Sequence, residues 1–241
     1  MTEKAFEFLH PGKLFGAEIT GSMIAERINQ KYRSIPLTLD LEKIEEDKPL
    51  PKENILYQAA LNSELDLLDA PFRTALPQDI FEAYHQNAIP DIDDLSFPIF
   101  AALYGTLGTH RAHANSLYAQ LKESGRIQKP KQLPFALSGL RASPNTESPH
   151  SIELIFDPEK SGCDNARILR KSEIFPVERI FGHESWEQFY SGRFRERRPV
   201  NNFPNNGFRH FNVHYNLVVD HMDYSEEHMH ETNSGILLVK E

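Results

Sequence analysis

The spacing of hydrophobic residues predicts helices in the first half of the chain. Between residues 13 and 33, apolar side chains recur at near-helical intervals, although Gly16 and Gly21 weaken the pattern. The apolar residues of 53–69 fall on one helical face, so the acidic residues of this segment are expected on the solvated side. The predicted helices are 13–33, Glu53–Asp69, a short helix opened by Pro77, and a longer helical region from Pro98 to about Glu123.

Two histidines in the last of these regions have the spacing of a metal-binding pair. His110 and His113 lie three residues apart, but Leu117 and Leu121 continue the same stripe. We therefore interpret both histidines as core or edge residues rather than as ligands.

Prolines and short apolar runs predict a change to β-structure after residue 128. Prolines recur from Pro130 to Pro158 and exclude long helices, whereas Leu133–Leu140 and Ser151–Asp157 have the pattern of short strands. We expect an α+β fold in which a mainly helical region, residues 1–128, packs on a mostly antiparallel sheet formed by residues 129–241. The two regions form either separate units or one continuous domain.

The clearest strand pattern is Arg209–Asp220, in which apolar and polar residues alternate. The face that includes Phe211 and Val213 must be buried, because alternate side chains of a strand point to opposite sides. A purely structural strand would more often carry Lys, Glu or Thr on its other face. That face is a candidate binding surface, because it instead holds His210, Asn212, His214, Asn216, Val218 and Asp220.

The tail is expected to fold back onto this strand. His228–Thr232 is interpreted as a returning strand, followed by a turn and a final strand from Ile236 to Lys240. Strand parity then places His228 opposite Asp220, on the same face as His214. The candidate catalytic residues are therefore His214, Asp220 and His228.

The composition is that of an acidic, water-soluble globular protein. The 241 residues include 26 Lys and Arg against 35 Asp and Glu, a net charge of −9. The longest apolar stretch, 97–107, is too short to span a bilayer, the N-terminus lacks a secretory pattern, and the single Cys163 excludes an internal disulfide. These features lead us to expect a cytoplasmic protein that does not enter membranes.

An arginine-rich segment interrupts this acidic background. Residues 193–209 contain five arginines and one acid, whereas 40–69 carry a net charge of −6. Arginine binds phosphate and carboxylate in a bidentate manner, and the phenylalanines of the segment suit stacking on a flat ligand. Neutralisation of the two segments by each other is the simpler interpretation. The candidate ligand-binding residues are Arg195, Arg197, Arg198, Arg209, His210 and Asn212.

Histidine is concentrated near the C-terminal end. Five of the 11 histidines fall between residues 210 and 230, together with four carboxylates. Imidazole and carboxylate groups ligate zinc, iron, manganese and nickel, so a divalent transition metal is the candidate cofactor, with His221 and His230 as ligands. Solvated tail histidines are the alternative, because the spacing matches no specific motif.

Cys163 is a further candidate, as a nucleophile. A short helix beginning near it would activate the thiol, and His210 or His214 with Asp220 would complete a Cys-His-Asp order. An inert cysteine is the favoured interpretation, because the surrounding sequence has no recognised signature.

Three hypotheses about function follow. The first is binding of an anionic ligand, a phosphate-bearing small molecule or a nucleic acid, at the arginine segment beside the His/Asn strand face, with a histidine as general acid or base. The second is a metal-dependent enzyme that uses the C-terminal histidines and carboxylates. The third is a non-catalytic module that binds a protein partner. Only the first two allow for catalysis.

Overall fold

The helices that the structure describes lie mainly in the first half of the chain. The structure, a computed structural model, describes residues 4–32, 55–76, 79, 82–83, 86, 88, 97–104, 112–128, 135–148, 151–165, 207–214, 217–222 and 236–240. Within these ranges the long helices are α1 (Gly21–Lys31), α2 (Ile55–Leu67) and α4 (Ala112–Glu123), with a short 3-10 helix at Leu14–Gly16. None of the described helices has the length and apolar character needed to cross a bilayer.

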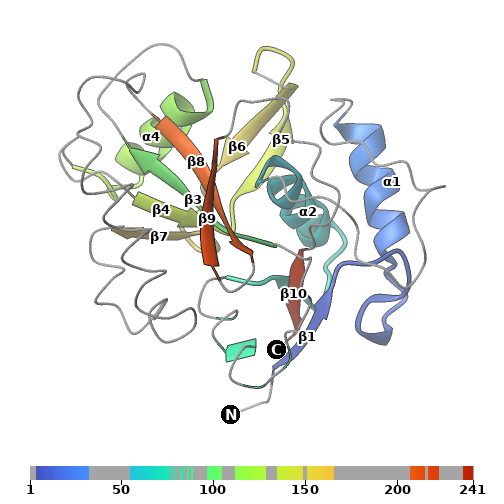
Figure 1. Cartoon of the computed structure of the whole chain (residues 1–241). Helices are drawn as coiled ribbons and strands as arrows, with labels where there is room; N and C mark the ends of the chain where they lie inside the picture. The colour runs from blue at the N-terminus through green and yellow to red at the C-terminus, as the bar shows by residue number, and fades with distance from the viewer. Residues whose placement is uncertain are drawn as a thin grey trace.

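The described strands pair in antiparallel sheets, which confirms the α+β class (Figure 1). One sheet has the order β1 (Ala5–Phe8), β10 (Leu237–Lys240), β2 (Arg73–Thr74). A larger sheet has the order β7 (Gly162–Asn165), β4 (Phe135–Ser138), β3 (Phe97–Tyr104), β8 (Gly207–His214), β9 (Leu217–Met222). Strands β5 (Arg141–Pro144) and β6 (Ile152–Ile155) form a separate pair.

The segment Phe97–Tyr104 differs most from its prediction. It was expected to begin a helical region, but it is β3, the central strand of the five-stranded sheet, and α4 begins only at Ala112. A short apolar run is typical of a central strand as well as of a buried helix, and periodicity alone does not separate the two. The first half therefore contributes β1, β2 and β3 to the sheets in addition to its helices.

The first and last described strands lie side by side. Strand β10 was expected to follow a returning strand at 228–232, a segment that lies outside the described residues. Its partners are instead β1 on one side and β2 on the other, with Phe6 opposite Val239. The C-terminal strand is thus part of a sheet built by the N-terminal half of the chain.

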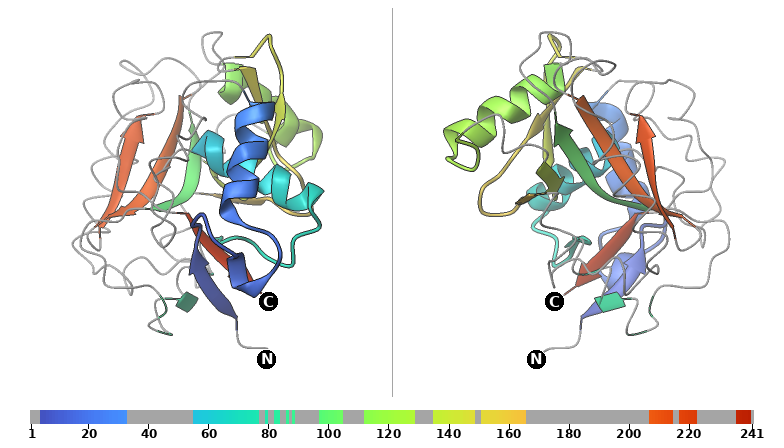
Figure 2. Two further views of the ribbon diagram at one scale, coloured as in Figure 1. Left: turned by 90° about the vertical axis from the view of Figure 1, so that its right-hand side faces the viewer. Right: turned by 60° about the vertical axis from the view of Figure 1, so that its left-hand side comes forward.

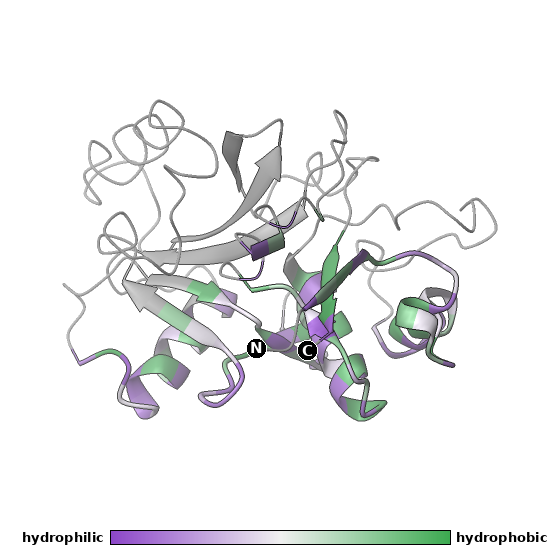
Figure 3. Cartoon of the chain, turned by 90° about the horizontal axis from the view of Figure 1, so that it is seen from below, coloured by the Kyte–Doolittle hydropathy of each residue, from purple (hydrophilic) through white to green (hydrophobic). Residues whose placement is uncertain are grey.

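Helix α1 has a defined start and one buried face. The Thr20 hydroxyl oxygen accepts a hydrogen bond from the Met23 N–H at 3.1 Å, which caps the first turn. A Cβ atom at Gly21 would lie 1.8 Å from the carbonyl oxygen of His10, so only glycine fits there. Ile24 and Ile28 are buried, and hydrophobic and hydrophilic positions are interspersed along α1, the helix at the right of Figure 3.

Helix α2 is buried on nearly all sides. Every residue from Leu56 to Leu65 is buried, and the helix contacts α1 on one side and β5 on another (Figures 1 and 2). The predicted helix is confirmed, but the solvated acidic face is wrong at Glu64, which is only 1% exposed. Its carboxylate binds Arg27 and Lys31 of α1, each at 2.8 Å, so the acid joins two helices.

The hydrophobic core draws on both halves of the chain. It extends from Leu9 to Leu238 and includes Leu117 and Leu121 of α4, the helix that packs against β6. His113 is buried on the same stripe, which confirms that it is a core histidine, whereas His110 lies outside the described residues.

Candidate functional site

The predicted strand Arg209–Asp220 is in fact a hairpin. Residues 207–214 form β8 and residues 217–222 form β9, with His214 paired to Leu217. The two connecting residues, 215–216, lie outside the described residues. The prediction was wrong because Leu217, Val218 and Val219 are all apolar, so the pattern does not reveal that the chain reverses and the parity changes.

The hairpin register changes which positions share a face of the sheet. His210 pairs with His221, and Phe211 pairs with Asp220, so these partners lie on common faces. Position 220 is therefore on the opposite face from position 214, and the expected shared face of His214 and Asp220 is corrected. His221, the candidate metal ligand, belongs to β9.

The remaining predicted site residues are divided between the hairpin and segments that are not described. Arg209 pairs with Met222 in the hairpin, and Asn212 pairs with Val219. Strand neighbours alternate between faces, so Arg209 lies on the opposite face from His210 and Asn212. Outside the described residues lie Arg195, Arg197, Arg198, His228 and His230. Their proposed roles stay predictions.

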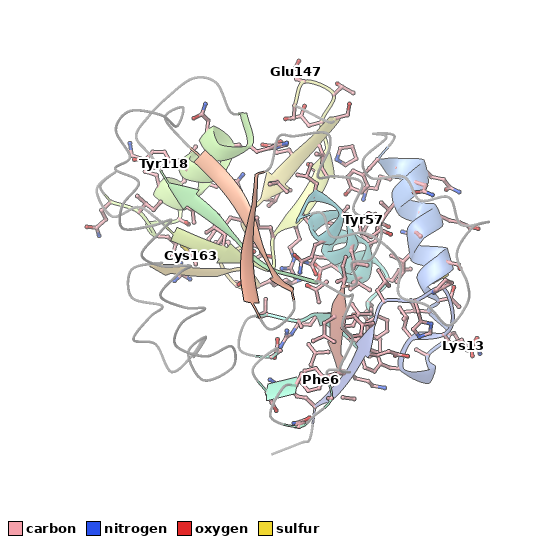
Figure 4. All side chains as sticks on the ribbon, in the orientation of Figure 1. Phe6, Lys13, Tyr57, Tyr118, Glu147 and Cys163 are labelled. Atoms are coloured by element: carbon pink, nitrogen blue, oxygen red, sulfur yellow. The ribbon has the colours of Figure 1, made fainter. Side chains whose placement is uncertain are left out.

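Cys163 lies in a strand and not at the start of a helix. It belongs to β7, the edge strand that pairs with β4, and its position is labelled in Figure 4. The thiol packs partly buried against the hydrophobic core. The nucleophile hypothesis therefore loses the helix N-terminus on which it depended.

A pocket of about 510 Å³ lies between the C-terminal end of α2, strand β2, the start of β5 and the turn at 158–160. This volume is in the range of sites that hold small organic ligands. The polar wall contains cations and carboxylates in equal number, together with the buried Asn62. The charged lining residues are Arg73, Arg141, Lys160, Asp66, Asp69 and Glu159.

The carboxylate of Asp66 stands between two of these cations. Its Oδ2 accepts a hydrogen bond from Nε of Arg141 at 3.0 Å, and its Oδ1 pairs with Nζ of Lys160 at 2.9 Å. Partial burial would raise the pKa of Asp66, but hydrogen bonds from the two cations outweigh burial and hold the pKa below its usual value. Arg141 is oriented by a further hydrogen bond to the carbonyl oxygen of Gly139.

The third cation, Arg73, is held by a different carboxylate. Its guanidinium binds Asp79 with two nitrogens, at 2.5 and 3.3 Å. Asp79 is completely buried and also binds Nζ of Lys4 at 2.9 Å and the N–H of Leu76 at 2.7 Å. Arg73 is therefore fixed at the pocket by an ion-pair network centred on the buried Asp79, which also includes Lys4, the residue before β1.

None of these pocket residues was among the site residues predicted from the sequence. Asp66 has the spacing of an exposed helical acid, and Arg141 follows it 75 residues later, so no motif connects them. Only the packing of α2 against β5 brings the acid and the cation together.

Comparisons with protein-family models, with curated proteins and with solved structures find no match to this chain. The described side chains also contain no group of three or more His, Cys, Asp or Glu residues able to hold a metal ion.

Proposed function

We propose that the protein binds a small anionic ligand, whose acidic group takes the place of the Asp66 carboxylate between Arg141 and Lys160. The observation that supports this function is the geometry of Asp66, each of whose oxygens binds a different cation at the wall of the pocket. Two cations that hold a carboxylate in this way suit the two oxygens of a ligand carboxylate or phosphate.

Displacement of Asp66 is energetically accessible. The Asp66 side chain is 35% exposed, and Lys160 is 47% exposed, so the carboxylate can return to water when a ligand arrives. An ion pair of this exposure contributes only about 0–1 kcal/mol. Arg141, in contrast, is 13% exposed and remains in place through its hydrogen bond to Gly139.

A matched pair of variants tests this function. Asp66 and Asp69 both line the pocket, but among the described residues only Asp66 pairs with Arg141 and Lys160. Asp66→Asn should strengthen binding of butyrate or inorganic phosphate by about threefold or more, whereas Asp69→Asn should change it by less than about twofold. The measurement is an NMR titration of the full chain with each anion.

Removal of the cations should have the opposite effect. Arg141→Gln should weaken binding about tenfold, the typical loss for a hydrogen bond to a charged group. Lys13→Met, which removes an exposed lysine paired with Glu18 away from the pocket, is the control. If neither the parent protein nor Asp66→Asn binds any anion, the three charges are only a surface ion-pair cluster and the proposal is wrong.

The nucleic-acid form of the hypothesis has a test of its own. It depends on Arg195, Arg197 and Arg198, which lie outside the described residues. Joint replacement of Arg197 and Arg198 by Ala should weaken RNA or DNA binding and reduce its dependence on salt. Absence of binding by the parent protein at low salt would contradict this form.

A second candidate function is binding of a divalent transition metal at the β8–β9 hairpin. The pairing of His210 with His221 supports it, because directly opposed positions are close enough for both residues to serve one ion. His210→Ala or His221→Ala should lower the nickel or zinc retained by the purified protein, whereas His214→Ala should not. A metal-free parent protein whose melting temperature ignores both metals would contradict this function.

A further inference from the structure

Apolar residues also line the pocket, beside its charged groups. Of its lining residues, Leu65, Phe72 and Val239 are buried, whereas Leu76 and Ala70 are partly exposed. We infer that the ligand is an amphipathic monoanion, a carboxylic acid with a compact apolar body. This inference rests on the function proposed above and names its ligand class.

The charges of the pocket provide for one acidic group and no more. Arg73 is already neutralised by the bidentate contact with buried Asp79, so it offers no second anion subsite. Asp69 and Glu159 add negative charge to the exposed part of the wall. Ligands with several phosphates are therefore disfavoured by repulsion, whereas a single carboxylate matches the group that it displaces.

The buried Asn62 of the pocket lining already has hydrogen-bond partners within the protein. Asn62 donates from Nδ2 to the carbonyl oxygen of Leu140 at 2.9 Å, and its Oδ1 accepts from the Thr74 hydroxyl at 2.6 Å. A ligand body that entered next to them would gain more from apolar contact than from hydrogen bonds. This arrangement favours an alkyl or aryl body over a sugar or a nucleotide.

Phe72, the aromatic residue of the pocket lining, is held in position by a second aromatic ring. The ring of Phe72 packs against the ring of Phe15, with centroids 5.2 Å apart and planes tilted by 42°. Phe15 has a positive φ of 50°, and its N–H donates to Oε2 of Glu7 at 2.6 Å, which fixes this uncommon backbone conformation. Phe72 is therefore already positioned before an apolar ligand binds, so less side-chain entropy is lost on binding.

The experiment is a titration of the unmodified full chain with acids of increasing length. Acetate, butyrate, hexanoate and benzoate are compared with inorganic phosphate and hexyl phosphate, and affinities are measured by NMR. Each added methylene should strengthen binding about fourfold until the pocket is filled. Hexanoate and benzoate should bind more tightly than inorganic phosphate.

A pair of leucine variants locates the apolar body. Leu76→Ser should remove most of the gain in affinity that lengthening the acid from acetate to hexanoate produces. Leu67→Ser is the control, because Leu67 is 63% exposed on α2 and does not line the pocket. The acid series on the parent protein remains decisive if Leu76→Ser fails to fold.

The outcomes separate this inference from the function on which it rests. If affinity does not rise with the length of the acid, or if hexyl phosphate binds clearly more tightly than a carboxylate of equal length, the ligand is not an amphipathic carboxylic acid. The proposed anion binding would still stand. No binding of any anion, with Asp66→Asn equally inactive, overturns both.

Discussion

The buried carboxylate of Asp79 should be the most sensitive charged position in the described part of the protein. Asp79 is completely buried and binds Lys4 and Arg73, which are 24% and 34% exposed. In Asp79→Asn, the amide can still accept from the Leu76 N–H, but its NH₂ group meets two cations that have only donors. The variant therefore removes from both cations the carboxylate that they share, while Lys4 keeps its ion pair with Glu82 at 2.9 Å.

The size of the effect follows from the exposure of the partners. Loss of one member of a buried ion pair costs about 3–5 kcal/mol when the other member stays buried. Here both cations can regain part of their hydration, so we expect a loss of about 2–3 kcal/mol. For a protein of this length that loss lowers the melting temperature by about 5–10 °C.

Acid should remove the difference between parent and variant. Burial would raise the pKa of Asp79, but hydrogen bonds and charge from Arg73 and Lys4 outweigh it, and the pKa lies below the ordinary value of 3.8. A lowered pKa stabilises the folded state above pH about 4, and this contribution is lost as the pH falls through the folded pKa.

The assay is urea unfolding of parent and variant at pH 7 and at several lower pH values. Glu18→Gln serves as the control, because Glu18 and Lys13 form an exposed pair whose loss should not change stability measurably. A variant Asp79→Asn as stable as the parent at pH 7, or a difference that grows towards pH 3, would refute the reasoning.

Three further predictions concern the packing of α1 and α2. Glu64→Gln should lower the free energy of unfolding by about 1–3 kcal/mol, because Glu64 is buried while Arg27 and Lys31 are partly exposed. Urea unfolding measures this loss, with the exposed Glu26→Gln as control. Burial raises the pKa of Tyr32 to about 12. The stability that this phenol contributes is therefore present below pH 10 and is lost as the pH rises towards 12. An absorbance titration in which Tyr32 shows the ordinary phenol pKa of 10.0 would contradict this. Gly21→Ala should destabilise far more than Gly16→Ala. At Gly21 the added Cβ would meet the His10 carbonyl, whereas at Gly16 the space is open and only the positive φ of 67° opposes a side chain; equal melting temperatures would exclude that clash.

The elements predicted best are those whose local sequence pattern is compatible with one kind of secondary structure. Strand β6 was expected within Ser151–Asp157, and its residues alternate between buried and half-buried positions. Helix α2 was expected within Glu53–Asp69, because the spacing of its apolar residues is helical. Segments of this kind carry their structure in local periodicity, so a single sequence is sufficient to find them.

The elements predicted poorly are those in which several neighbours are apolar. The run 97–104 fits a central strand as well as a helix, and the run 217–219 fits either strand parity. In both cases the hydrophobic pattern is satisfied by two arrangements, and pairing with distant strands selects one of them. Register is a property of partners, which the sequence of one strand does not contain.

The acids of α2 show why the candidate site escaped sequence analysis. Glu64 and Asp66 are two residues apart on the same helix, and both were expected to be solvated. The packing of α1 buries Glu64 against Arg27 and Lys31, whereas Asp66 remains 35% exposed beside Arg141 of β5 and Lys160. The first acid therefore joins two helices, while the second is the one that the proposed ligand would displace. This difference depends on the elements that pack against each side of α2, so helical periodicity predicts the helix but not which of its carboxylates a ligand can replace.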